Sequence, residues 1–228
     1  MHLTIAGTTV PIERAVGLVS GYATEHPRTL TVYDGRAHGA IREWRKYTPA
    51  DIEAARVIER RAITQKVAET VLVADLPWAE VPKRTIDLED VGPDSRSYAQ
   101  LSRFYVALRS IDGVGPAVAT KLMYLRWPAA TPIQDSLLEA LYREAAAAKY
   151  AELRATGTLP PVVTDNGWRR LYLLAVRDDL LAARESGALA RLREDLGDVL
   201  AADAGAKVEA LSDCRLIDIL AWSLRKGR

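Results

Sequence analysis

The strongest constraint on the fold comes from two glycines that stand between two apolar helical segments. Gly113 and Gly115 flank one apolar residue, Val114. Residues 97–111 lead into them with apolar side chains at three- and four-residue spacing, and residues 115–125 continue as a second helical segment. Glycine permits a tight turn and leaves backbone N–H groups uncovered at the start of the second helix. The pattern is typical of a helix-hairpin-helix, whose second helix can bind a phosphate at its N-terminus.

A single carboxylate follows this hairpin. Asp135 stands 22 residues after Gly113, behind a loop at residues 127–132 that contains two prolines. Residues 135–150 have a strongly helical pattern, so Asp135 falls at a helix N-terminus, where the dipole stabilises an ionised carboxylate. Such a residue is either a structural N-cap or a functional acid. Its spacing from the hairpin favours a functional role.

The order of these features resembles the helix-hairpin-helix DNA glycosylases, whose signature is a hairpin, a loop rich in glycine and proline, and a catalytic Asp. The resemblance covers about 40 of the 228 residues and is closest to an uncharacterised bacterial branch of that superfamily. The residues that carry it are Gly113, Gly115, Ala119, the loop 127–132 and Asp135. The resemblance implies that the protein flips a nucleotide out of DNA and that Asp135 assists hydrolysis of the glycosidic bond.

Two departures from the family pattern narrow this expectation. Bifunctional members carry a nucleophilic lysine two residues after the second glycine, but this chain has Ala117 there and Lys121 one turn later. Some members hold an iron–sulfur cluster with four cysteines, whereas Cys214 is the only cysteine here. The resemblance therefore implies a monofunctional glycosylase-like hydrolase, and we expect no cofactor and no metal site.

The contacts with DNA are predicted from the same segment. We expect phosphates to lie against the backbone of the hairpin, with two cations adding positive charge. The predicted DNA-binding residues are Gly113, Val114, Gly115, Ala117, Lys121 and Arg126. The candidates for stacking on a flipped base are Tyr33, Trp44, Tyr124 and Trp127. Core packing is the default alternative for each of these aromatic side chains.

Composition limits the class of protein. The chain is 49% hydrophobic, which indicates a globular fold, and its net charge of +1 argues against tight nonspecific binding to DNA. One cysteine suits a reducing cytosol. The N-terminus lacks the pattern of a signal peptide, and no apolar stretch is long enough to cross a membrane. We therefore expect a cytoplasmic protein with DNA as its partner and no membrane association. The oligomeric state is left open.

The helical pattern predicts an all-α fold of two helical lobes. Residues 1–228 form a single helical unit, and the loop at residues 75–95 suggests lobes 1–94 and 95–228. A second loop is predicted at residues 156–167. The alternating residues 29–33 suggest one short strand or extended segment near the N-terminus.

The last helix, near residues 212–225, places Arg215, Asp218 and Trp222 on one side. We interpret this trio as a lock that holds the helix in the core rather than as a ligand site.

Two alternatives remain open. The chain is either a non-catalytic DNA-binding or scaffold module that keeps the glycosylase fold, or a structural protein whose hairpin is only a tight turn between helices. A gel-shift assay separates the second alternative from the other interpretations. Assays of base release over a panel of damaged bases separate an enzyme from a binding module.

Overall fold

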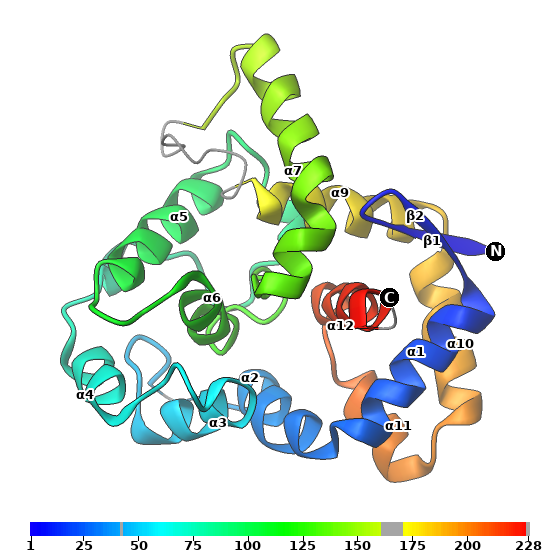
Figure 1. The fold of residues 1–228 in the computed structure, drawn as a ribbon, viewed down its shortest axis with the longest axis horizontal. Helices are drawn as coiled ribbons and strands as arrows, with labels where there is room; N and C mark the ends of the chain where they lie inside the picture. The colour runs from blue at the N-terminus through cyan, green and yellow to red at the C-terminus, as the bar shows by residue number, and fades with distance from the viewer. Residues whose placement is uncertain (42, 161–170, 227–228) are drawn as a thin grey trace.

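The structure, a computed structural model, describes residues 1–41, 43–160 and 171–226. Within these ranges the fold is mainly α-helical, as predicted, with a small antiparallel β-hairpin at the N-terminus (Figure 1). The strands are β1 (His2–Ile5) and β2 (Thr8–Pro11), paired with Leu3 opposite Val10. The α-helices are α1 (Ile12–Glu25), α2 (Gly35–His38), α3 (Pro49–Glu59), α4 (Gln65–Val73), α5 (Arg96–Arg109), α6 (Pro116–Tyr124), α7 (Ser136–Ala155), α9 (Tyr172–Glu185), α10 (Ala188–Val199), α11 (Ala202–Glu209) and α12 (Asp213–Lys226). Part of the predicted loop at residues 156–167 lies outside the described residues.

Side-chain caps begin several of the helices. Thr48 and Asp51 form a capping box at α3, in which the Thr48 N–H donates to the Asp51 carboxylate at 2.7 Å. The Ser95 hydroxyl accepts from the Tyr98 N–H at the start of α5 at 3.0 Å, and Asp135 caps α7. These caps satisfy N–H groups that have no partner inside a helix. The helix start predicted at Asp135 is therefore confirmed.

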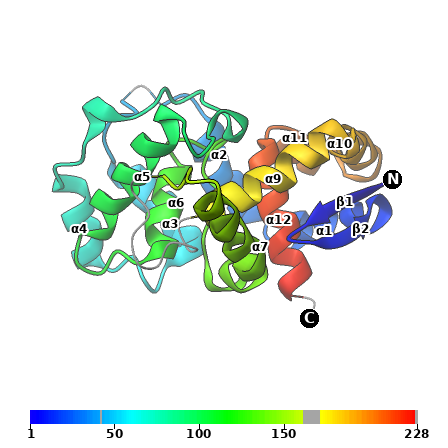
Figure 2. The same cartoon turned by 90° about the horizontal axis from the view of Figure 1, so that it is seen from above.

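The two ends of the chain build one half of the molecule and its middle builds the other. α1 packs on α10 and α12, and β1 packs on α9. In the other half, α3 packs on α4 and α6, and α5 packs on α6. We call these halves the terminal lobe and the central lobe. Figures 1 and 2 show them side by side, with α7 and α12 near the boundary.

This arrangement differs from the predicted division into lobes 1–94 and 95–228. The N-terminal hairpin and α1 bury apolar residues such as Leu3 and Val19 and pack on helices from the other end of the chain. The Ala6 N–H also donates to Asp179 of α9 at 2.6 Å. The chain therefore leaves the terminal lobe for the first time after α1, because the apolar face of α1 packs on α10 and α12.

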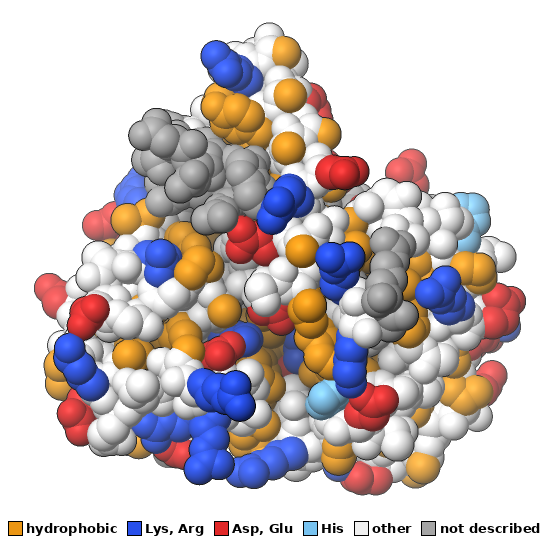
Figure 3. All heavy atoms as spheres, in the orientation of Figure 1, with side chains coloured by type: hydrophobic (Ala, Val, Ile, Leu, Met, Phe, Trp, Pro, Cys, Tyr) orange, Lys and Arg blue, Asp and Glu red, His pale blue; other side chains and the backbone are white. Residues whose placement is uncertain are grey.

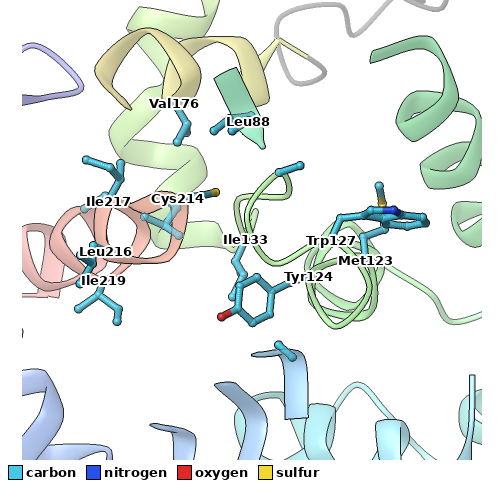
Figure 4. Close-up of a cluster of buried hydrophobic side chains, with 14 of the residues drawn as sticks. Leu88, Met123, Tyr124, Trp127, Ile133, Val176, Cys214, Leu216, Ile217 and Ile219 are labelled. Atoms are coloured by element: carbon cyan, nitrogen blue, oxygen red, sulfur yellow. The ribbon is translucent and has the colours of Figure 1, made fainter. Parts of the chain in front are cut away.

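The core is continuous between the lobes. Figure 4 shows Ile133, from the loop after α6, beside the ring of Tyr124, with Met123 of α6 to one side and Leu216 of α12 to the other. None of these four side chains is more than 3% exposed. Fully burying a large apolar side chain stabilises a fold by about 1.5–3 kcal/mol. The loop that leads to Asp135 is therefore anchored on both sides.

Residues 29–33 form a helical segment rather than the extended segment that was predicted. They belong to a π-helix, η1 (Thr29–Asp34). Leu30 and Tyr33 are buried three positions apart, as on one face of a helix, and Asp34 is also buried. The short β structure of the N-terminus lies earlier in the chain, in β1 and β2. π-Helical turns often occur at functional sites, and η1 forms one wall of the cavity described below.

Candidate active-site cavity

The helix-hairpin-helix is formed by α5, α6 and the turn at residues 110–115. Gly113 has a φ of +81°, and a Cβ at this position would lie 2.7 Å from Cγ2 of Val67. Gly115 is the N-cap of α6 with a φ of −77°, and a Cβ there would meet no atom within 4 Å. Only the first glycine is therefore required by the backbone conformation. Val114 is buried, and its carbonyl accepts a hydrogen bond from the Arg109 guanidinium.

The exposed part of this turn carries an acid. Asp112 forms an ion pair with Lys66 of α4 at 2.9 Å, and both side chains are exposed. The hydrogen bond and positive charge of Lys66 lower the pKa of Asp112. Ala117 is half-buried in the first turn of α6, where backbone N–H groups have no helical partner. The turn that precedes this helix start therefore carries a negative charge, while the helix start itself carries N–H donors.

The two cations that were predicted to contact phosphate are buried in ion pairs. Lys121 is 5% exposed, and its Nζ donates to the Glu59 carboxylate at the end of α3. Arg126 is fully buried and donates to Asp51 from Nη2 at 2.5 Å and from Nη1 at 3.2 Å. Both side chains tie α6 and its following loop to α3. Neither is a surface cation, which corrects their predicted role.

Asp135 is the N-cap of α7 and also a cavity residue. Its Oδ1 accepts the N–H groups of Leu137 at 3.0 Å and Leu138 at 2.9 Å. The residue is half-buried and lines a cavity of about 250 Å³. The structural and the functional interpretation of Asp135 are therefore compatible with each other.

This cavity lies between the lobes. Its walls come from the end of α1, from η1, α3, α6 and α12, and from the segment that enters α7. In Figure 3 this face of the molecule is hollowed near its centre, and acidic and basic side chains gather there. The lining side chains that carry a charge or a polar ring are Tyr22, His26, Lys121, Asp135, Arg215, Asp218 and Trp222. The cavity therefore combines carboxyl groups, cations and aromatic rings.

Arg215 connects the cavity to a buried polar network. Its Nε donates to Asp34 of η1 at 2.9 Å, and its Nη2 donates to the Tyr22 hydroxyl at 3.0 Å. The Tyr124 hydroxyl also donates to Asp34, at 2.9 Å. A buried ion pair with hydrogen bonds on both sides is held in one geometry. Arg215 therefore fixes α12 against η1, as its predicted locking role required.

Asp218 lies one turn further along α12 and is 2% exposed. Its Oδ2 accepts the Ile133 N–H at 2.9 Å, and Nη1 of Arg215 is 3.9 Å from the same oxygen. Burial raises the pKa of Asp218 to about 8, although Arg215 and the Ile133 N–H act in the opposite direction. Asp218 shares its cavity with Asp135, so this residue belongs to the candidate site as well as to the contacts that hold α12 in the core.

The aromatic residues predicted to stack on a base do not line this cavity. Tyr33, Tyr124 and Trp127 are fully buried, and Tyr33 stacks on Tyr124 with ring centroids 5.1 Å apart. Trp44 is half-buried and packs edge-on against Trp127 at 6.3 Å. All four belong to the packed interior, which was the default alternative for each of them.

The aromatic wall of the cavity consists of Tyr22, His26 and Trp222. The Trp222 ring is perpendicular to both others, with an interplanar angle of 84° in each case and centroid distances of 5.7 Å to Tyr22 and 5.2 Å to His26. Partial burial, and after it the charge of Lys226, lower the pKa of His26. The sequence signal for this wall was helical spacing. Tyr22 and His26 are four residues apart, as are Asp218 and Trp222, and residues four apart lie on the same face of a helix.

Among the described residues, no three or more His, Cys, Asp or Glu side chains gather where they could hold a metal ion. The same part of the chain has no helix with the length and apolar character needed to cross a membrane.

The fold and the cavity define a mainly helical, two-lobed protein with a helix-hairpin-helix and a polar site between its lobes. The chain belongs to the family of unknown function DUF6308, whose model matches residues 15–225. That match includes the hairpin and every charged or aromatic residue of the cavity wall. No curated protein and no solved structure matches the chain.

Proposed function

We propose that the protein is a monofunctional DNA base-excision N-glycosylase, a hydrolase of DNA repair. The observation that carries this proposal is the position of Asp135. This carboxylate lies on the segment that leaves the helix-hairpin-helix, and it lines a polar cavity between two lobes. Resemblance to the helix-hairpin-helix glycosylases, in the order and spacing of hairpin and Asp, supports the same function.

In this proposal the hairpin grips DNA through its backbone. N–H groups around Gly115 and Ala117 bind the phosphates beside the target nucleotide, because the start of α6 offers free donors and a positive helix dipole. A base stacked inside a duplex cannot be attacked, so the nucleotide turns out into the cavity. Tyr22 and Trp222 offer apolar ring surface to it there.

Asp135 then acts on the sugar. Cleavage of the glycosidic bond develops positive charge on the sugar ring, and a nearby carboxylate stabilises that charge and orients the attacking water. The two N–H bonds from Leu137 and Leu138 leave Oδ2 of Asp135 available for this role and hold the carboxylate in place. Ala117 stands where bifunctional helix-hairpin-helix glycosylases carry a nucleophilic lysine, so the proposed reaction is restricted to hydrolysis.

A non-catalytic DNA-binding module is the second candidate. It is favoured by the burial of Lys121 and Arg126 and by the exposed Asp112 on the hairpin, since these features weaken the attraction to phosphates.

Gel shifts on duplexes that each contain one damaged or mismatched base test DNA binding, and release of free base from the same duplexes tests catalysis. We expect both signals for at least one duplex. Binding without base release would support the non-catalytic module. Absence of both binding and base release would contradict both candidate functions.

A further inference from the structure

Asp218 lines the cavity, and one of its carboxyl oxygens is buried without a hydrogen-bond partner in the described part of the chain. Its Oδ2 is held by the Ile133 N–H at 2.9 Å, but its Oδ1 has no hydrogen-bond partner among the described residues. A buried polar atom without a partner is costly, and in a native structure it points to a missing partner. The cavity wall on which Asp218 lies makes a bound ligand the natural partner.

The surroundings of Asp218 favour a carboxyl group that keeps its proton. Burial is the largest influence and raises the pKa of Asp218 to about 8, and the nearby carboxylates Asp135 and Asp34 act in the same direction. Arg215 opposes this influence, but its Nε hydrogen bond is to Asp34, and its Nη1 is 3.9 Å from the nearest Asp218 oxygen. The titratable and charged groups around Asp218 are Arg215 and Cys214 of α12, Asp34 and Tyr33 of η1, Asp135 before α7, Tyr142 of α7, Tyr172 of α9, Lys121 of α6, Tyr22 of α1, and His26, which follows α1.

We propose that Asp218 is the general acid of this site, donating a proton from Oδ1 to a ring nitrogen or carbonyl oxygen of a base bound in the cavity. The proposal rests on the proposed function, because it assigns a second role in the same reaction. Two carboxyl groups in different settings suit the two halves of glycosidic cleavage. Asp135 opposes the positive charge on the sugar, and Asp218 neutralises the negative charge on the departing base.

Proton transfer from Asp218 accompanies cleavage of the glycosidic bond. As the bond between C1′ and the base nitrogen breaks, its electron pair moves onto the base, which takes the proton from Asp218 and leaves as a neutral molecule. Water adds to C1′ and gives one proton to Asp135. Asp218 is then reprotonated from solvent as Asp135 releases its proton, so the net reaction is hydrolysis.

A binding experiment tests the hydrogen bond without requiring turnover. The probe is 9-methylpurine, which has ring acceptors but no N–H, and binding is followed by calorimetry between about pH 6 and about pH 9. We expect wild-type affinity to be constant at neutral pH and to fall about tenfold per pH unit above about 8, as Asp218 loses its proton. Asp218→Asn keeps an N–H donor that does not titrate, so it should bind the probe without that fall.

The matched control is Asp179→Asn, which converts a half-buried carboxyl to an amide outside the cavity. This variant should keep the wild-type pH dependence. A wild-type affinity that is constant across the range, or an equal fall in Asp218→Asn, would contradict the proposal. Absence of any binding would contradict both this assignment and the proposed function.

A pair of DNA substrates tests the proton transfer itself. One releases a neutral purine and the other releases 7-methylguanine, which is already cationic in the nucleotide and leaves without needing a proton. Asp218→Asn should slow release of the neutral base by about 10²- to 10⁴-fold and change release of 7-methylguanine by only a few-fold. Equal slowing of both would contradict the role of Asp218 and leave the proposed function standing. If the wild type releases neither base while the binding result holds, the proposed function fails and the Asp218 hydrogen bond remains.

Discussion

Arg126 and Asp51 form an ion pair in which neither side chain is exposed, with Nη2 and Oδ2 2.5 Å apart. Burial by itself would raise the pKa of Asp51, but hydrogen bonds from Arg126, Arg36 and Thr48 and the charge of Arg126 lower it to about 2. The pair joins the loop after α6 to the start of α3. It thereby positions the segment that leads from the hairpin to Asp135.

Removing Arg126 should destabilise the fold rather than weaken contact with DNA. Arg126→Ala leaves Asp51 as a buried charge without its main partner, so we expect a loss of about 3–5 kcal/mol in the free energy of unfolding in urea. Arg14→Ala, at an exposed position, is the control and should change stability by less than about 0.5 kcal/mol. An Arg126→Ala protein of wild-type stability with weakened DNA binding would support the phosphate contact that the sequence first suggested.

The two hairpin glycines should respond differently to alanine. Gly113→Ala places a Cβ on a backbone with a φ of +81° and against Val67, so we expect a loss of more than about 1 kcal/mol. Gly115→Ala meets no neighbouring atom and should be neutral or stabilising by about 0.4–1 kcal/mol. Denaturant titrations measure both changes. Equal effects would mean that the turn differs from the one described here.

The hairpin should give no covalent chemistry. Ala117 stands at the position where bifunctional helix-hairpin-helix glycosylases carry a nucleophilic lysine, and the Nζ of Lys121 is engaged by Glu59. Borohydride treatment of the protein with DNA should therefore trap no adduct. A trapped adduct that disappears in Lys121→Ala would show that this lysine leaves its carboxylate partner and reacts.

Stability should depend on pH through Asp179. Burial raises the pKa of Asp179 to about 6, although the Ala6 N–H and the Tyr142 hydroxyl that donate to it act in the opposite direction. A carboxyl with a raised folded pKa contributes stability that is fully present below its unfolded pKa near 3.8 and is lost as the pH rises through about 6. Wild type should therefore lose on the order of 1–3 kcal/mol relative to Asp179→Asn between about pH 4 and about pH 6.

The Asp218 carboxyl, whose pKa is raised to about 8, affects stability in the same direction. Its contribution to the free energy of unfolding falls as the pH rises to about 8. The two contributions are separated by measuring each Asn variant against wild type at every pH. A constant difference between Asp179→Asn and wild type would mean that Asp179 keeps an ordinary pKa.

Local signals predicted the parts of the site that depend on neighbouring residues. The hairpin follows from glycines between apolar segments, and the helix start at Asp135 follows from capping chemistry. These features require only a few adjacent residues. They were therefore visible in the sequence without knowledge of the fold.

The second carboxyl group could not be found in this way. Asp218 and Ile133 are 85 positions apart, and the hydrogen bond between them depends on how α12 packs beside the loop after α6. Lys121 and Arg126 resemble surface cations in sequence, but both have carboxylate partners on α3, which lies far earlier in the chain. The predicted lobe boundary differs from the observed one for the same reason, because α1 packs on helices from the opposite end of the chain.

The central claim is that the negative charge of Asp135 promotes release of the base. Single-turnover base release by Asp135→Asn tests this claim most directly. Asn is about as good an N-cap as Asp, so the variant should fold with nearly unchanged stability. Its rate should fall by orders of magnitude on a substrate that the wild type processes, because the charge that opposes the cationic sugar is gone. DNA affinity should hold or rise slightly, and Asp179→Asn should keep the wild-type rate. Base release by Asp135→Asn at the wild-type rate would contradict the account.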